Sequence, residues 1–151
     1  IYIWLRFQWN FALGAIIALI HDVILTLGFF SFLKLDFNLA TVAAVLTIAG
    51  YSINDTVVIY DRIRESMRKY KQSSFDDVIN ISLNGTLSRT LTTSLTTLLA
   101  LGALFIFGGI VISSFIIALI WGVLIGTYSS LYVASPILAF LGSDNREKKE
   151  N

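Results

Sequence analysis

The chain has 151 residues, of which 56% are hydrophobic and only 14% are charged, and its mean hydropathy is +0.76. A soluble domain is about 45–50% apolar with about a quarter of its residues charged, so this composition argues against a soluble monomer. The net charge of +1 argues against a nucleic-acid-binding surface, and no nucleic acid is expected as a partner. With no cysteine and one histidine, the chain offers no disulfide framework, thiol chemistry or zinc cluster, so neither metal nor cofactor is predicted.

Apolar stretches dominate the chain from its first residue. Because the sequence opens inside an apolar run, residues 1–10 are interpreted as the end of a truncated transmembrane helix followed by a cytoplasmic turn. A bilayer core of about 30 Å needs about 20 apolar residues in a helix, and four later stretches suit this length. They cover residues 11–33, 39–60, 90–107 and 114–141. The sequence therefore predicts an all-α, integral-membrane, polytopic bundle with four full transmembrane helices plus the end of another.

Basic residues predict the orientation of these spans, because short loops rich in Lys and Arg stay in the cytoplasm. If the chain crosses the membrane at each span, one set of loops holds every basic residue except Lys34. This asymmetry places residues 61–89 in the cytoplasm as a connector and residues 142–151 there as a polar C-terminal tail. The links at 34–38 and 108–113 are expected on the opposite side.

A short amphipathic helix is predicted within the connector. Ser74 is typical of a helix N-cap, because Asp76 and Asp77 follow it in the first turn. One helical face then collects Phe75, Val78, Ile79 and Leu83. Gly85 is expected to end or bend this helix, which would lie against the membrane or the bundle. The basic residues before it fit either a solvated linker or a contact with membrane lipid.

Small residues on the spans indicate helix-packing faces, since lipid gives helices little hydrophobic reason to associate. A stripe on the second full span recurs at steps of three and four: Ala40, Ala43, Thr47, Gly50, Asn54, Val57 and Asp61. The last span carries small residues at steps of four: Gly122, Gly126, Ser130 and Ala134. The third span begins with a cluster of Ser and Thr whose hydroxyls can bond to facing helices. Pro136 is expected to kink the last span without preventing its insertion.

Asp22 lies near the middle of its span, where an aspartate costs about 2.5–3.5 kcal/mol on insertion. Because burial disfavours the charged form, an acid at this depth can hold a proton and release it when water or a cation arrives, as a proton carrier must. The alternative is structural: Asp22 ties helices together, for example through Thr47 or the Thr-rich span. His21 points about 100° away on the helix and is interpreted as an interior residue rather than a relay.

Asn54 and Asp55 lie lower in the next span, about a turn and a half before Asp61 and Arg62. Adjacent antiparallel helices would place Asp22 and Asp55 on one polar path, offset in depth by about 9 Å. Direct contact is therefore not expected, and water or hydroxyl side chains would have to bridge the two acids. Asp61 and Arg62 belong to a charged turn at the interface, for which a solvated helix end with ion pairs is the alternative interpretation.

Several segments resemble, in order along the chain, the SecF-type members of the SecD/SecF family of bacterial protein-export membrane proteins. These segments are GAIIALIHDV at 14–23, AGYSINDTVVIYDRIRE at 49–65, SRTLTTSLTTL at 88–98, GG at 108–109 and IGTYSSLYVASPI at 125–137. The resemblance implies half of a transporter of the resistance-nodulation-division superfamily, with six helices and an extracytoplasmic domain. The four full spans would then correspond to helices three to six.

The resemblance also implies a multi-pass protein of the bacterial cytoplasmic (inner) membrane that is not an enzyme. Such a protein associates with SecD beside the Sec translocation channel and uses the proton-motive force to support late steps of protein export. The exported polypeptide would be contacted only indirectly by these residues. Carried onto this sequence, the proton pathway would use Asp22, Asn54 and Asp55, with Asp61 and Arg62 near its cytoplasmic exit.

Three other functions compete with this interpretation. An intramembrane aspartyl protease needs two carboxyls that share a proton, and both the expected depth offset and the lack of a GxGD motif count against it. A non-transporting membrane scaffold subunit would tolerate asparagine at Asp22. An exporter of drugs or lipids from the same superfamily fits the segment at 49–65 less well. No phosphate-cradling glycine loop occurs, so ATP is not expected to be the energy source within this chain.

Overall fold

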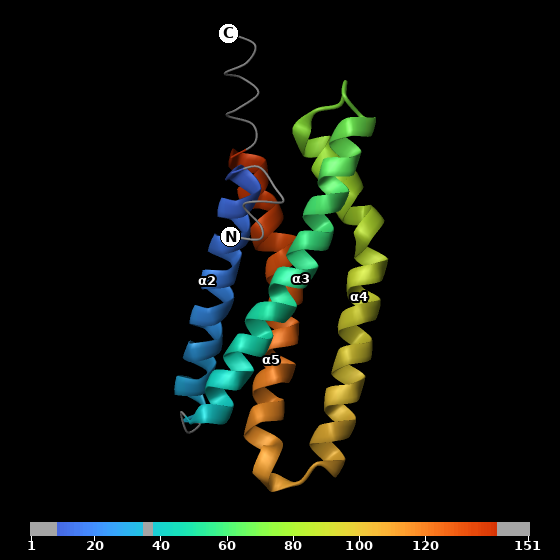
Figure 1. Cartoon of the computed structure of the whole chain (residues 1–151). Helices are drawn as coiled ribbons and strands as arrows, with labels where there is room; N and C mark the ends of the chain where they lie inside the picture. Colours follow the sequence, from blue (N-terminus) through green and yellow to red (C-terminus); the bar gives the residue numbers. More distant parts are fainter. Residues whose placement is uncertain (1–8, 35–37, 142–151) are drawn as a thin grey trace.

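The structure is a computed structural model that describes residues 9–34 and 38–141. In these two ranges the chain forms four long, apolar helical segments that pack side by side as a bundle (Figure 1). The first three are α2 (Trp9–Phe32), α3 (Leu39–Lys69) and α4 (Phe75–Phe107). The fourth combines η1 (Ile110–Ile112), α5 (Ser113–Ser129) and the π-helical turn η2 (Ser130–Ala134), and residues 135–141 continue it as helix.

Each of the four segments is long and apolar enough to cross a membrane, which confirms the predicted all-α, polytopic class. The segments run alternately up and down, with the α3–α4 turn at one end, and the end of α2, the start of α3 and the α4–α5 link at the other (Figure 1). This alternation agrees with the one assumed for the basic loops, whereas the membrane side of each end stays a prediction. The helix end predicted at 1–5 and the polar tail predicted at 142–151 lie outside the described residues, and α2 already begins at Trp9.

The helices on either side of the predicted connector are longer than expected, and only the turn at 70–74 separates them. At its end, α3 is closed by the backbone N–H of Tyr70, which donates to the carbonyl of Ser66 at 2.8 Å. Ser74 caps α4 as predicted, because its Oγ accepts from the backbone N–H of Asp77 at 3.1 Å. The residues predicted as a connector are therefore mostly continuations of the two helices.

Gly85 does not end α4, which was one of the two outcomes expected of it, and the helix runs through it. The space that a Cβ would take is bordered by the side chain of Arg62, whose Nε would lie 3.5 Å from that atom. The predicted amphipathic face does pack. Phe75, Val78 and Ile79 are buried, and Leu83 packs against the hydrophobic cluster that contains Phe75 and Ile79. This part of α4 therefore lies against the bundle.

Two apolar clusters form the core, one toward each end of the bundle. The larger cluster contains Tyr60, which is fully buried, lies edge-on to Phe11 at 5.2 Å and donates to the carbonyl of Ala134 at 3.0 Å. The smaller cluster joins Phe30, Ala44 and Ala118. Along α2, α3 and α5, the residues between these two clusters include a set of buried polar side chains, and this set positions the candidate site.

The glycines of α5 lie where the last helix approaches α3. A Cβ at Gly122 would overlap the side chain of Ile48, and a Cβ at Gly126 would lie 3.3 Å from that of Ser52. Ser130, on the same face, is fully buried. The small-residue face of the last span is thus turned inward.

Gly50 does not pack within this chain, contrary to the prediction. It is exposed, and a Cβ there would meet no atom within 4 Å. The stripe to which it belongs lies on the outer side of α3: Ala40, Ala43, Thr47, Gly50 and Asn54 are exposed, and Val57 and Asp61 are half-buried. The inward face of α3 instead carries Thr41, Ala44, Ile48, Ser52, Asp55, Thr56 and Ile59.

A π-helical turn precedes Pro136, where a kink was predicted. Proline has no N–H, and its ring clashes with the carbonyl four residues earlier, here that of Tyr132. The wider turn of η2 lies directly before it, and the Ser135 hydroxyl donates to the carbonyl of Ser130 at 3.2 Å. Ser129 and Ser130 therefore stand where the helix changes its hydrogen-bond spacing.

Candidate functional site

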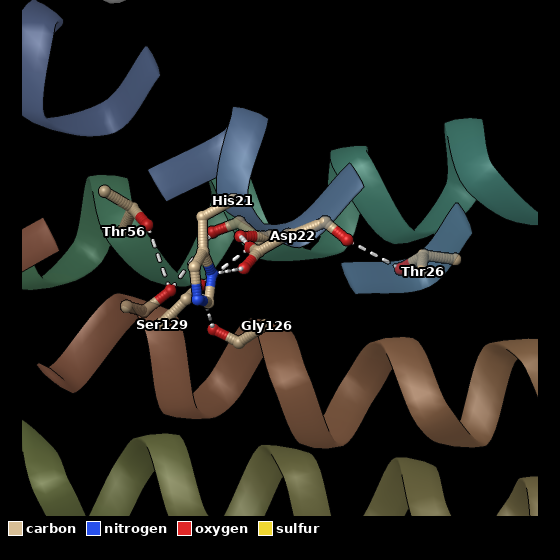
Figure 2. A network of polar contacts seen from close by, with 8 residues as sticks. His21, Asp22, Thr26, Thr56, Gly126 and Ser129 are labelled. Atoms are coloured by element: carbon tan, nitrogen blue, oxygen red, sulfur yellow. Dashed lines mark hydrogen bonds and ion pairs between the residues drawn. The ribbon is translucent and has the colours of Figure 1, made fainter. Parts of the chain in front are cut away.

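The carboxyl group of Asp22 lies where α2, α3 and α5 meet, and none of it is exposed (Figure 2). The hydroxyls of Ser52, on α3, and Ser129, on α5, both donate to its Oδ2, the latter at 2.7 Å. On the other side, Nδ1 of His21 lies 3.0 Å from Oδ1. One carboxyl group therefore connects three helices.

Helical spacing on α2 explains why Asp22 points inward. Ala15, Ala18, Asp22 and Thr26 recur at steps of three and four and are all buried. The Thr26 hydroxyl, the next polar group on this face, donates to the backbone carbonyl of Asp22 at 2.7 Å and is thus satisfied within α2. The carboxyl is left to face the neighbouring helices.

The partners of Asp22 differ from those suggested by the sequence. Thr47 is exposed and donates to the carbonyl of Ala43 on its own helix at 2.8 Å, because it lies on the outer side of α3. Threonines at the start of the Thr-rich span also bond within α4, as Thr92 does to the carbonyl of Ser88 at 2.7 Å. His21 was expected to point away from Asp22, but its ring nitrogen reaches the carboxyl.

Further hydroxyl pairs join the same helices. Thr56 and Ser130 are 2.9 Å apart between α3 and η2, and the Ser130 hydroxyl lies 3.4 Å from the backbone carbonyl of Ser52. Ser94 and Thr127 are 2.6 Å apart between α4 and α5. The middle of the bundle therefore contains a layer of hydroxyl side chains around the buried acid.

Asp55 follows Ser52 by about one helical turn and is only 6% exposed. Its Oδ2 is buried and has no hydrogen-bond partner among the described residues, while Arg89, on α4, attracts the carboxylate electrostatically. Because Asp22 bonds to Ser52, its offset from Asp55 along the helix axis is about 4.5 Å, or half of the offset that was expected. Asn54 does not join the two acids, since it lies on the exposed face of α3.

A charged pocket of about 470 Å³ opens beside this region, between α3 and α4. Asp61, Arg62, Glu65 and Arg89 contribute its charged side chains. At the rim, Arg62 donates to Glu65 at 2.7 Å, with both side chains largely exposed. Arg89 thus lines the pocket and also attracts the Asp55 carboxylate inside the bundle.

Sequence reasoning counted Arg89 as one more loop charge and missed its place in the site. The available signal was the SRT triplet at 88–90, which belongs to the resembling segments. Arg89 falls one residue before the predicted third span, and α4 in fact begins fourteen residues earlier, at Phe75. Because Arg89 is part of the helix, its side chain is directed toward α3, whereas the direction of a loop side chain would not be fixed in this way.

Comparison with known proteins places the chain in a family. Residues 1–144 match the family model described as protein export membrane protein SecD/SecF, C-terminal. The protein translocase subunit SecF of Rhodobacter capsulatus is 60% identical over 150 residues, which cover 99% of this chain and 45% of that protein. SecF of Rickettsia bellii is 58% identical over 148 residues, covering 98% of this chain and 49% of that protein.

A solved structure agrees with these matches. The crystal structure of SecDF in its super-membrane-facing form superposes with a TM-score of 0.93 at 43% identity, covering 99% of this chain and 20% of that one. The chain spans about half the length of the SecF proteins that it matches. Together with the four apolar helices, these matches show that the chain belongs to the SecD/SecF family of protein export membrane proteins and corresponds to its C-terminal membrane part.

Proposed function

We propose that this chain is the C-terminal membrane part of a SecF-type translocase subunit that couples proton movement through the inner membrane to late steps of protein export. The observation that carries the proposal is the fully buried carboxyl of Asp22, held by hydroxyls from two other helices. Ionisable side chains inside a transmembrane bundle are costly and mark ion or proton pathways. The relatives are SecF translocase subunits, and this similarity suggests the export function.

The two buried acids suit different parts of this task. The Asp22 oxygens already accept hydrogen bonds, whereas Asp55 keeps one buried oxygen without a partner among the described residues. That oxygen can take a proton without displacing a donor, and Arg89 links Asp55 to the charged pocket at the end of α3. Asp61 and Arg62 line this pocket and would form its cytoplasmic exit.

SecD is the proposed partner of the exposed stripe on α3, because the matching SecDF structure is a longer chain of which this part forms 20%. Thr47 and Asn54 expose polar side chains on a helix that is otherwise apolar enough to span a membrane. In lipid such groups favour contact with another helix, and the small residues around Gly50 allow a close approach. The Sec channel would lie beside this complex, with both the turn at 70–74 and the C-terminus in the cytoplasm.

A charge-neutralising pair of variants tests the proposal in the full-length subunit bound to SecD. Asp22→Asn and Asp55→Asn should insert and bind SecD normally but abolish the increase in protein export that a proton gradient produces in membrane vesicles. Asp76→Asn is the matched control, since Asp76 is an exposed aspartate in the first turn of α4. Export that still responds fully to the gradient in both variants would refute proton coupling through these acids.

That negative result would favour a second candidate, a non-transporting scaffold subunit, which the exposed stripe on α3 supports by itself. The geometry gives less support to an aspartyl protease. Asp22 is engaged by Ser52, Ser129 and His21, whereas Asp55 interacts with Arg89, so the two carboxyls have separate partners. A protease would need them to share one proton.

A further inference from the structure

Ser129 has two acceptors for its single hydroxyl hydrogen. Its Oγ lies 2.7 Å from Oδ2 of Asp22 and 3.3 Å from the backbone carbonyl oxygen of Gly126, on its own helix (Figure 2). Ser129 and Asp22 are both fully buried, so neither group is open to bulk water. The shorter of the two contacts is the one to the carboxyl group, and the hydroxyl needs only a rotation about its C–O bond to use the other.

The arrangement around Asp22 suits an ionised carboxylate. Ser52 and Ser129 both donate to Oδ2, and the His21 ring nitrogen lies beside Oδ1. A carboxylate accepts all of these bonds, but a carboxylic acid carries a hydrogen of its own that must be donated. A proton placed on Oδ2 would meet two hydroxyl hydrogens that point at the same oxygen, so one hydroxyl has to turn away.

We propose that Ser129 is the residue that turns, as a hydrogen-bond switch that keeps every buried polar group paired when Asp22 takes up a proton. In the protonated state, the new O–H of Asp22 donates to Oγ of Ser129, and the Ser129 O–H donates to the carbonyl of Gly126. On release, the proton leaves Asp22 and the Ser129 hydrogen returns to Oδ2. Only the O–H bond of Asp22 forms and breaks, and Ser129 keeps its own hydrogen throughout.

Ser52 does not share this property. In the part of the chain that the structure describes, its hydroxyl bonds to Asp22, and no second acceptor is placed beside it as Gly126 is beside Ser129. Ser129 is therefore a positioning residue for the proposed proton carrier. This role rests on the proposed function, because it requires Asp22 to change its protonation state.

Other ionisable side chains lie near Asp22, so the test must follow the Asp22 carboxyl itself. His21 lies beside it on α2, and Asp55 lies about one turn beyond Ser52 on α3. The facing segment of α5 and η2 contributes only Tyr128 and Tyr132 as titratable side chains, and both are exposed. A pH profile of export alone would combine all of these groups.

Infrared difference spectroscopy of the full-length subunit with SecD in lipid nanodiscs, recorded as the pH is lowered, reports on one carboxyl. The C=O band of protonated Asp22 is identified by its loss in Asp22→Asn. Ser129→Ala removes the acceptor of the Asp22 O–H and should shift this band to higher wavenumber. Ser129→Cys, similar in size but a weaker acceptor, should give a smaller shift in the same direction.

Two neighbouring serines serve as controls for this shift. In Ser52→Ala the Asp22 O–H still donates to Ser129, so the band should keep its position. Ser130→Ala removes a fully buried serine that pairs with Thr56 at 2.9 Å, and it should also leave the band in place. A general loosening of the bundle would move the band in all of these variants alike.

The outcomes separate the switch from the proposed function. A band that moves equally in Ser52→Ala and Ser129→Ala, or in neither, overturns the switch. If the wild type shows no Asp22 band at any pH, the switch is overturned together with the role of Asp22 in proton coupling. If the band shifts as expected while Asp22→Asn and Asp55→Asn both still export fully in response to the gradient, the switch stands and the proposed function fails.

Discussion

Replacing Gly122 by alanine should destabilise the bundle by a predictable amount. A Cβ at this position would overlap Cγ1, Cδ1 and Cγ2 of Ile48, a residue that is only 2% exposed and has little room to move. Overpacking of a well-packed interior costs about 1–3 kcal/mol. The higher helix propensity of alanine returns about 1 kcal/mol, so we expect a net loss of up to about 2 kcal/mol in the free energy of unfolding.

Reversible unfolding in bicelles, measured by steric trapping, can resolve a change of this size. Gly28→Ala in α2 is the matched control, because a Cβ there would meet no atom within 4 Å. It should leave stability unchanged or raise it by up to about 1 kcal/mol. Equal stability of the two alanine variants would refute the close approach of α5 to α3.

A double-mutant cycle identifies the residue responsible. Ile48→Val removes Cδ1, one of the overlapping atoms, and in the wild-type background should cost about 0.5–1.5 kcal/mol. In the Gly122→Ala background its cost should be smaller or reversed, which would appear as a coupling energy between the two sites. If the costs of the two substitutions are purely additive, the added methyl group at position 122 does not overlap Ile48.

Three further variants test separate contacts. Tyr60→Phe deletes the buried bond to the carbonyl of Ala134 and should lower the free energy of unfolding by about 1–3 kcal/mol, and an unchanged value would mean that this carbonyl finds another donor. Ser74→Ala removes the N-cap of α4 and should cost about 1 kcal/mol, with faster amide exchange confined to the first turn of that helix. Asn54→Cys in the full-length subunit should cross-link to SecD, whereas the fully buried Ser82→Cys should not, and the reverse pattern would contradict the proposed contact through the stripe.

The existence of the four spans was readable from sequence because membrane insertion depends on hydropathy summed over about 20 residues. The cap at Ser74 was also predictable, since it depends on residues within one turn. By contrast, Gly85 does not end the helix, although an end was one of the two outcomes expected there. A glycine lowers helix propensity by about 1 kcal/mol, and the packing of Val78 and Ile79 on one side of it outweighs this penalty.

The rotation of α3 could not be predicted from its own residues. A small-residue stripe indicates that some helix approaches closely, but it does not say whether that helix belongs to the same chain. The sequence pointed to Gly50, while the structure turns Ile48 and Ser52 toward α5. A stripe facing a partner subunit and one facing the bundle have the same spacing.

The burial of Asp22 followed from its depth in the span, but its hydrogen-bond partners did not. These depend on how α2, α3 and α5 slide along one another, and a shift of one turn replaces every contact across the interface. Ser52 and Ser129 could be named only once that alignment was known. Arg89 was hidden for the same reason, because its role depends on α4 extending past the predicted span.

The length of the α3–α4 pair has a mechanical consequence. At 31 and 33 residues, these helices are about 46 and 50 Å long, whereas the hydrocarbon core is about 30 Å thick. Their joined ends therefore project about 15 Å beyond the lipid tails as a stiff arm closed by a five-residue bend at 70–74. A tilt of about 10° at mid-membrane moves the tip of such an arm, about 30 Å from the pivot, sideways by about 5 Å. Any change in the tilt of this helix pair is therefore largest at the bend, outside the hydrocarbon core.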